Sequence, residues 1–342
     1  MGKESPGKRR PTMTDVAKLA GVSQSTVSLI VNEKPNITIP DSTRDKVWAA
    51  VKQLGFRPNA LAQGLRSDRS GIVGFMTDEL VTTNFAGLIV KGAQDAAWLQ
   101  RKILMLVNLD DREGMAEETI EKMLEHRVDG LIFATMYHHA VVLPELIREI
   151  PTVLVNCFVE DRSLPSVVPD EVEGGRRATE ILIQRGHRRI GFINNTKPIP
   201  ATFGRVAGYR LALEQHSIPY DDDLVVSLNS GEDGGYQGTQ QLLNLPQPPT
   251  AIFCYNDRTA MGTYYALIER KLKVPNDVAV MGYDNQEIIA QHLRPSLSTM
   301  ELPHYQMGQW AIEYLSKNDT GKKNRSPVQH QIVPQFIQRS SI

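Results

Sequence analysis

Polar side chains stand where short apolar runs of the sequence end. Four such runs are each followed by a carboxylate or an amide, and a fifth leads into a helical stretch that opens with a guanidinium. Because ligands of open parallel sheets bind at the carboxyl ends of the strands, these side chains are expected to face one cleft. Such groups can bond adjacent hydroxyls, and a phenyl ring can stack on a sugar, which favours a sugar or polyol ligand. The candidate ligand-binding residues are Asp78, Asn84, Phe85, Asn156, Arg205, Asn256 and Asp284.

Residue patterns typical of catalysis do not stand out. The sequence has no G-x-S-x-G turn, no H-E-x-x-H metal motif and no G-x-G-x-x-G after an apolar run. His138 and His139 are adjacent, but no second cluster has ligand spacing, so we expect them in a loop or at a helix start rather than on a metal. The sequence therefore predicts a protein that is not an enzyme, with no catalytic residues, no cofactor and no metal.

Most of the chain alternates short apolar runs with helical stretches. This alternation is typical of βαβ units with buried parallel strands. Four runs precede the segment VVPDEVEGG and three follow it, which predicts two open α/β sheets. The runs cover 72–76, 103–107, 130–134 and 152–155, then 190–193, 251–255 and 278–282.

The first part of the chain has a different, purely helical pattern. Thr12 and Asp15 have the spacing of a capping box, Gly21 ends the first helix, and Ser23 is a suitable cap for the second. A third helix over 42–54 ends at Gly55. It is expected to complete a small core with Val47, Trp48, Ala50, Val51 and Leu54.

The second of these helices has an apolar inner face and a mainly polar outer face. Val27, Ile30 and Val31 recur at helical spacing on the inner face. Short polar groups on an outer face can hydrogen-bond base edges in the major groove of DNA. The outer residues are Gln24, Ser25, Ser28, Leu29 and Asn32.

Charge is distributed unevenly along the 342 residues. Residues 1–70 hold 12 Lys and Arg against 6 Asp and Glu, whereas the whole chain has a net charge of −1. A basic head suits contact with a polyanion, and a solvated basic tail is the alternative interpretation. Since the N-terminus lacks the apolar stretch of a secretory signal and no apolar run could span a bilayer, a cytoplasmic protein without membrane contact is expected.

The segment TDVAKLAGVSQSTVSLIVN resembles the head of the lactose-repressor (LacI/GalR) family of bacterial regulators. The resemblance continues through STRDKV, GFRPNALAQGL, VDGLIF, GRVAGYRLAL, YNDRTAMG and VPNDVAVMGYDN. It implies an all-α helix-turn-helix head and a hinge helix, followed by an α/β core like periplasmic binding proteins, with two doubly wound parallel-sheet subdomains. The expected divisions are a disordered basic tail (1–11), the head (12–58), the hinge (59–69), an N-terminal subdomain (70–168 and 299–325) and a C-terminal subdomain (169–298 and 326–342).

The family also implies residues that contact DNA. Its hinge helix wedges a leucine into a minor-groove base step, and the unstacking is offset by contacts that the bent duplex allows. Leu65 matches that leucine, with Arg66 beside it. The DNA-binding residues implied in addition to the outer face of the second helix are Thr12, Thr14, Asn59, Leu65 and Arg66.

The resemblance implies a homodimeric regulator that binds a pseudo-palindromic operator and represses carbohydrate-use genes under control of a sugar effector. Arg205, Asn256 and Asp284 are its best matches to family effector residues. Leu29, Asn156 and Ser230 depart from the family pattern, at positions where Arg or His, Asp and an aromatic residue often stand. Two alternatives stay open: a repressor that needs a purine corepressor, and a transport-type sugar-binding protein. A dimer is expected rather than a tetramer because VPQFIQRSSI is followed by no leucine-heptad tail.

Overall fold

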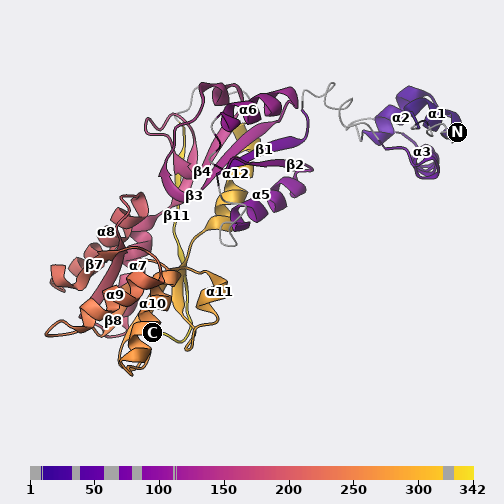
Figure 1. Ribbon diagram of the computed structural model, residues 1–342. Helices are drawn as coiled ribbons and strands as arrows, with labels where there is room; N and C mark the ends of the chain where they lie inside the picture. Colours follow the sequence, from indigo (N-terminus) through magenta and orange to yellow (C-terminus); the bar gives the residue numbers. More distant parts are fainter. Residues whose placement is uncertain are drawn as a thin grey trace, which may run out of the picture. The chain divides into compact units, whose positions relative to one another are not determined.

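The computed structural model describes residues 9, 11–32, 39–57, 69–78, 87–110, 112, 114–318 and 327–342. The chain divides into two compact units, Met1–Ser70 and Gly71–Ile342 (Figure 1). Most of the expected tail and nearly all of the expected hinge helix lie outside the described residues. So do five candidate site residues: Asn59, Leu65, Arg66, Asn84 and Phe85.

The N-terminal unit has three helices among its described residues, α1 (Met13–Ala20), α2 (Gln24–Val31) and α3 (Asp41–Leu54). The predicted capping box is confirmed, since Thr12 Oγ1 accepts from Asp15 N at 3.3 Å and Asp15 Oδ2 accepts from Thr12 N at 2.8 Å. Ser23 caps α2. Gly21 and Gly55 follow α1 and α3 with φ of 66° and 62°, the left-handed conformation that glycine adopts without strain.

One face of each helix forms the core of this unit. Val16, Val27 and Val47 are fully buried. Trp48 does not join them as predicted, because it is 45% exposed. Successive helical residues are about 100° apart, so the inward direction of Val47 turns its neighbour toward solvent.

The first sheet of the C-terminal unit has six parallel strands in the order β11-β5-β4-β3-β1-β2. Helix α12 (His304–Asn318) packs beside α5 (Gly87–Leu99), although the two are far apart in sequence (Figure 1). Helix α6 (Met115–Glu125) contacts the short 3-10 helix η2 (Glu145–Glu149). The strands are β1 (Ile72–Thr77), β2 (Ile103–Asn108), β3 (Gly130–Ala140), β4 (Thr152–Phe158), β5 (Ser166–Pro169) and β11 (Gln329–Ile332).

The second sheet has the order β12-β10-β9-β8-β6-β7, and only β12 runs antiparallel to its neighbour. Its strands are β6 (Ile190–Asn195), β7 (Val225–Leu228), β8 (Ala251–Cys254), β9 (Ala279–Asp284), β10 (Ser298–Glu301) and β12 (Gln335–Ile337). Helix α7 packs against α8, and α9 against α10. The helices are α7 (Glu171–Gln184), α8 (Pro200–Gln215), α9 (Glu232–Leu243), α10 (Asp257–Glu269) and α11 (Glu287–Ala290), with the 3-10 helix η3 (Asp222–Leu224).

The chain passes between the two sheets three times. It leaves the first sheet after β5, close to the expected residue 169, and returns between β10 and α12, a few residues after the expected 298. The third passage lies between β11 and β12, whereas residue 326 was expected. The polar strand β11 has no apolar run, and this explains why the sequence did not place it in the first sheet.

Candidate functional site

Helix α2 presents a neutral polar face. Gln24 and Ser25 are exposed, whereas Ser28, Leu29 and Asn32 are half-buried. Within this face Asn32 Nδ2 donates to Ser28 Oγ at 3.1 Å. The face carries hydrogen-bonding groups and one apolar side chain but no charge.

Helix α1 contributes to the same region of the head. Thr14 Oγ1 donates to Gln24 Oε1 at 3.5 Å, which joins the exposed residues of the two helices. Thr12 is half-buried, and its hydroxyl serves the capping box, with Asp15 Oδ2 at 2.7 Å. Thr12 therefore orients α1, and Thr14 and Gln24 are the more accessible groups.

A cleft of about 640 Å³ lies in the C-terminal unit, with walls from both sheets. Four of the predicted ligand-binding residues line it: Asn156, Arg205, Asn256 and Asp284. Asp78 is not among the described residues that line it. Ser230 does line it, together with residues that the sequence did not indicate, namely Tyr137, His138, Glu171, Lys197 and Tyr255.

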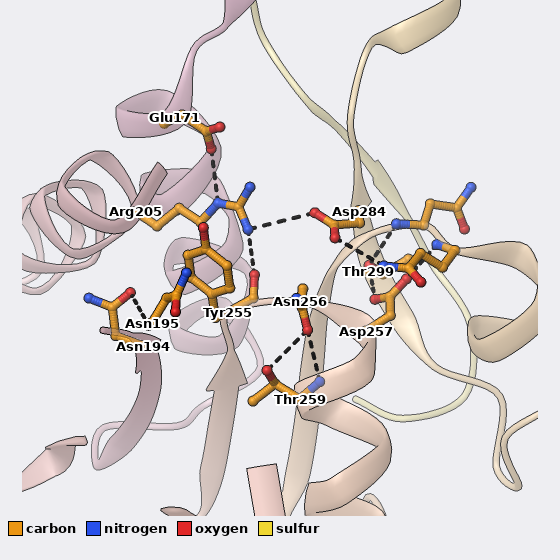
Figure 2. A network of polar contacts seen from close by, with 12 residues as sticks. Glu171, Asn194, Asn195, Arg205, Tyr255, Asn256, Asp257, Thr259, Asp284 and Thr299 are labelled. Atoms are coloured by element: carbon orange, nitrogen blue, oxygen red, sulfur yellow. Dashed lines mark hydrogen bonds and ion pairs between the residues drawn. The ribbon is translucent and has the colours of Figure 1, made fainter. Parts of the chain in front are cut away.

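Arg205 is the centre of a buried polar network (Figure 2). It lies in the second turn of α8 rather than at the helix start that was predicted, and it is 3% exposed. Its Nε donates to Glu171 Oε2 at 2.9 Å, and its Nη1 lies 3.6 Å from Asp284 Oδ1 and donates to the carbonyl of Tyr255. Burial lowers the pKa of Arg205, but the combined attraction of Glu171, the two tyrosines and Asp284 outweighs burial and raises it.

Aromatic rings complete the surroundings of this guanidinium. Its carbon lies 3.7 Å from the ring centroid of Tyr283 and 4.5 Å from that of Tyr255. A guanidinium over a ring face is electrostatically favourable. Two rings and two carboxylates therefore fix Arg205 before any ligand arrives.

The packing of α7 on α8 positions the pair of Glu171 and Arg205. A Cβ on Gly175 would lie 2.4 Å from the carbonyl oxygen of Arg205, and one on Gly208 would lie 2.1 Å from that of Val172. Glycine is needed at both places because the helix backbones touch. The sequence analysis did not indicate Glu171, although it stands two residues after the buried strand β5, in VVPDEV.

Asn256 is held by the helix that it starts. Its Oδ1 accepts from Thr259 N at 2.8 Å and from Thr259 Oγ1 at 3.0 Å, so that it caps α10. This cap occupies the amide oxygen and leaves the amide nitrogen as the donor for the cleft. Asp257 next to it is fully buried and accepts from Thr299 Oγ1 at 2.7 Å and Gln286 N at 2.6 Å, which ties the loop after β9 to β10.

Asp284 has an unusual backbone and an unusual proton affinity. Its φ of 102° is rare for a residue with a side chain, and strain of this kind is typical of ligand-binding positions. Burial raises the pKa of Asp284 to about 7 against the opposing charge of Arg205. The folded protein therefore retains a proton that the unfolded chain releases at a much lower pH.

The raised pKa of Asp284 makes the stability of the fold depend on pH. A raised carboxyl pKa stabilises the fold below the ordinary value of 3.8, and the contribution is lost as pH rises to about 7. Asp284→Asn has no such proton to lose. Its free energy of unfolding should therefore rise relative to that of the native protein, by up to about 4 kcal/mol between about pH 4 and about pH 7. Urea unfolding across this range measures the difference. Glu287→Gln, an exposed carboxylate beside the same cleft, is the matched control, and an Asp284→Asn difference that stays constant with pH would contradict the assignment.

The two histidines lie in strand β3, not in a loop or at a helix start, so that prediction is wrong. His138 lines the cleft, and His139 Nδ1 lies 2.7 Å from the carbonyl of Tyr137. Within the described part of the chain no group of three or more His, Cys, Asp or Glu residues could hold a metal. Cys157 and Cys254 are both buried, and neither forms a disulfide.

None of the described helices is both long enough and apolar enough to cross a membrane.

A helical DNA-binding head and a two-sheet core around a ligand cleft define a transcriptional regulator with a periplasmic-binding-protein-like effector domain. Two family models match the chain: bacterial regulatory proteins of the lacI family over residues 12–59, and periplasmic binding proteins and the sugar-binding domain of the LacI family over residues 70–339. The chain belongs to the LacI family. The predicted fold class is thereby confirmed, and so is the prediction that the protein is not an enzyme.

Relatives of known role cover nearly the whole chain. Catabolite control protein A of Priestia megaterium is 33% identical over 90% of this chain and 92% of its own length. The ribose operon repressor of Escherichia coli is 32% identical over 96% and 99%, and the repressor PurR of Vibrio atlanticus 29% identical over 97% and 98%. Among solved structures, the lac repressor dimer bound to operator and an anti-inducer aligns with a TM-score of 0.74 at 26% identity, covering 97% of this chain and 99% of that one.

Proposed function

We propose that this regulator represses carbohydrate-use genes and that a sugar in the cleft controls its operator binding. The observation that carries the proposal is the pre-arranged polar set of Arg205, Asn256 and Asp284 beside the rings of Tyr137 and Tyr255. Fixed donors and acceptors with an aromatic surface suit a ring with several hydroxyls. The relatives support this choice, since they include a ribose operon repressor and a regulator solved in complex with cellobiose.

A purine corepressor is the second candidate because PurR repressors are among the relatives. A thermal-shift screen of sugars and nucleobases separates the two, since a ligand stabilises the protein by mass action. We expect stabilisation by a sugar, and its loss in Asn256→Asp, which exchanges the amide donor for an acceptor. A nucleobase that stabilises the protein while sugars do not would overturn the sugar proposal. A transport-type binding protein, the third alternative, would have no use for the lacI-family head.

The effector acts only if it binds the DNA-binding and the released states with different affinity. Coupling of this kind is typically about 1–3 kcal/mol, or about 5- to 150-fold in affinity. Because the chain passes between the two sheets three times, a ligand that draws the cleft walls together moves both subdomains. We propose that this movement decides whether the DNA-binding segments can engage the operator.

We also propose that the protein acts as a homodimer. The end of α5 and the edge strand β2 carry exposed apolar residues, with Trp98 at 74%, Leu99 at 84% and Ile103 at 57% exposure. An exposed apolar patch on an edge strand is typical of an interface. A dimer suits the proposed operator, because a two-fold protein reads two half-sites.

Introducing a charge into this patch should separate the protomers. Leu99→Arg is expected to shift the protein from dimer to monomer at micromolar concentration and to weaken operator binding at least about tenfold, because burying a charge costs several kcal/mol. Sedimentation velocity measures the first effect and fluorescence anisotropy the second. Val142→Arg, a fully exposed position elsewhere in the same subdomain, is the control. A Leu99→Arg protein that stays dimeric would exclude this surface.

A further inference from the structure

Strand β3 carries a bulge that faces the cleft. Its pairing with β4 runs from Leu131↔Thr152 to Ala134↔Val155 and resumes at His139↔Cys157. Residues 135–138 therefore stand opposite the single residue Asn156. Bulges redirect side chains and are frequent next to functional sites.

Two of the predicted ligand-binding residues hold this bulge. Met136 N donates to the carboxylate of Asp78, at 3.1 Å to Oδ1 and 3.3 Å to Oδ2. Asn156 Nδ2 donates to the carbonyls of Thr135 at 3.1 Å and of Met136 at 3.0 Å. Thr135 Oγ1 lies 2.8 Å from the carbonyl of Tyr137 and 3.1 Å from that of Asn156. The carboxylate of Asp78 and the amide nitrogen of Asn156 thus bind backbone groups of the bulge.

The bulge turns Tyr137 and His138 to the cleft, and both line it. Tyr137 is 47% exposed, and the ammonium of Lys197, from the loop after β6, lies 5.4 Å from its ring centroid. An exposed ring of this kind offers a flat surface on which the C–H face of a sugar can pack. Tyr137 therefore supplies an aromatic surface on the cleft wall formed by the first sheet, as Tyr255 does on the wall formed by the second sheet.

His138 adds a polar group beside that ring. Its imidazole packs edge-on against Phe158 at 5.6 Å, and its Nδ1 is buried without a hydrogen-bond partner among the described residues. Burial lowers the pKa of His138 to about 4, so the ring is neutral at neutral pH. An unpartnered nitrogen is less costly as an acceptor than as a donor, which places the ring proton on Nε2. Nε2–H is then the group that the ring offers to the cleft.

We infer that Tyr137 and His138 are ligand-contacting residues, and that Asp78 and Asn156 are positioning residues that act through the bulge. The inference rests on the proposed sugar effector and deepens it. The ligand is a cyclic polyol that packs one face on the Tyr137 ring and accepts a hydrogen bond from His138 through a hydroxyl or ring oxygen. Asp78 and Asn156 contribute to affinity by holding these two side chains in place.

Calorimetric titration with D-ribose, D-glucose and cellobiose tests the assignment. With the probe that binds the native protein best, Tyr137→Ala and His138→Phe should each weaken binding about tenfold or more, because each removes one contact. His138→Gln, which places an amide N–H near the position of Nε2, should recover most of the affinity that His138→Phe loses, and Tyr137→Phe, which keeps the ring, should lose less affinity than Tyr137→Ala. His126→Phe, at an exposed site on the end of α6, is the control.

Nitrogen-15 spectra of the imidazoles separate contact from mere structural support. The His138 signals should show the Nε2–H tautomer in the free protein and shift on addition of the probe. Asp78→Asn should weaken binding of the probe, and it should shift the His138 signals even when no probe is present. Affinities within twofold of native in Tyr137→Ala and His138→Phe would overturn the inference while the proposed function stands. Failure of all three sugars to bind the native protein would overturn both.

Discussion

Replacing Arg205 with methionine should lower the free energy of unfolding of the C-terminal unit by about 3–5 kcal/mol at neutral pH, because it leaves buried carboxylates without their cation. Arg205 is the only cation within 4.0 Å of Glu171 and Asp284 among the described residues. Because Asp284 titrates at about 7, it can take up a proton when the arginine is gone. The loss of stability should therefore be smaller at about pH 6 than at about pH 8.

Urea unfolding followed by circular dichroism measures this effect. Arg210→Met is the matched control, since Arg210 lies on the same helix but is exposed and interacts with the hydroxyl and ring of Tyr220 rather than with a buried carboxylate. It should cost less than about 1 kcal/mol. The double variant Arg205→Met, Glu171→Met should be less destabilised than Arg205→Met alone, because it removes one stranded charge. A cost below about 1 kcal/mol for Arg205→Met would show that the network is not electrostatically coupled.

The function of the Arg205 variant follows from its place in the cleft. The fraction that stays folded should bind the operator but no longer respond to the effector, because Arg205 is a proposed effector contact and lies in a different unit from the helix-turn-helix. Loss of operator binding in folded protein would mean that the arginine is needed for the DNA-binding state itself.

Leu29→Arg should change which operator the protein prefers. The outer face of α2 has no cation, and guanine is read most often by arginine, through its O6 and N7. An arginine at the half-buried position 29 should add a guanine to the preferred half-site, with about 1–3 kcal/mol of discrimination at that base pair. Selection from a randomised duplex library, followed by anisotropy titration of the selected sequences, measures the change.

Leu19→Arg separates base reading from the added charge. Leu19 is 46% exposed on α1, outside the outer face of α2. The Leu19→Arg variant should bind all DNA sequences more tightly and with a steeper dependence on salt, without a new base preference. A Leu29→Arg protein that selects the same half-site as the native one would contradict the placement of Leu29 against the bases.

Much of the fold could be predicted because its main strands are continuous apolar runs. The runs at 72–76, 152–155 and 190–193 are strands β1, β4 and β6, each one to three residues longer than predicted. The missed strands have three or four residues, too few for a recognisable apolar run, and β10 and β11 are mostly polar. Strands β11 and β7 lie at sheet edges, where alternate residues reach solvent. Ser298 and Thr299 of β10 are buried with their hydroxyls paired, since Ser298 Oγ accepts from Arg339 N and Thr299 Oγ1 donates to Asp257 Oδ1, and no local pattern indicates this.

The part of the site that could be predicted from the sequence is the part that lies at the ends of strands. Asn256 and Asp284 come together because parallel strands end at one edge, whereas Arg205 reaches the same place from the second turn of α8. Asp78 follows β1, but Asn156 lies inside β4 rather than at its end as predicted, and the bulge in β3 takes up the carboxylate of Asp78 and the amide nitrogen of Asn156. A bulge depends on pairing between strands, so the sequence of one strand does not show it.

The most direct test of effector control is the operator affinity of the full chain with its cleft empty and with its cleft filled. A fluorescent duplex selected by the protein is titrated by anisotropy, without and with a saturating concentration of the sugar that stabilises the protein most in the thermal-shift screen. We predict a change in the dissociation constant of at least about fivefold, the lower end of typical allosteric coupling. Equal affinities with a filled cleft would show that the cleft does not control the head.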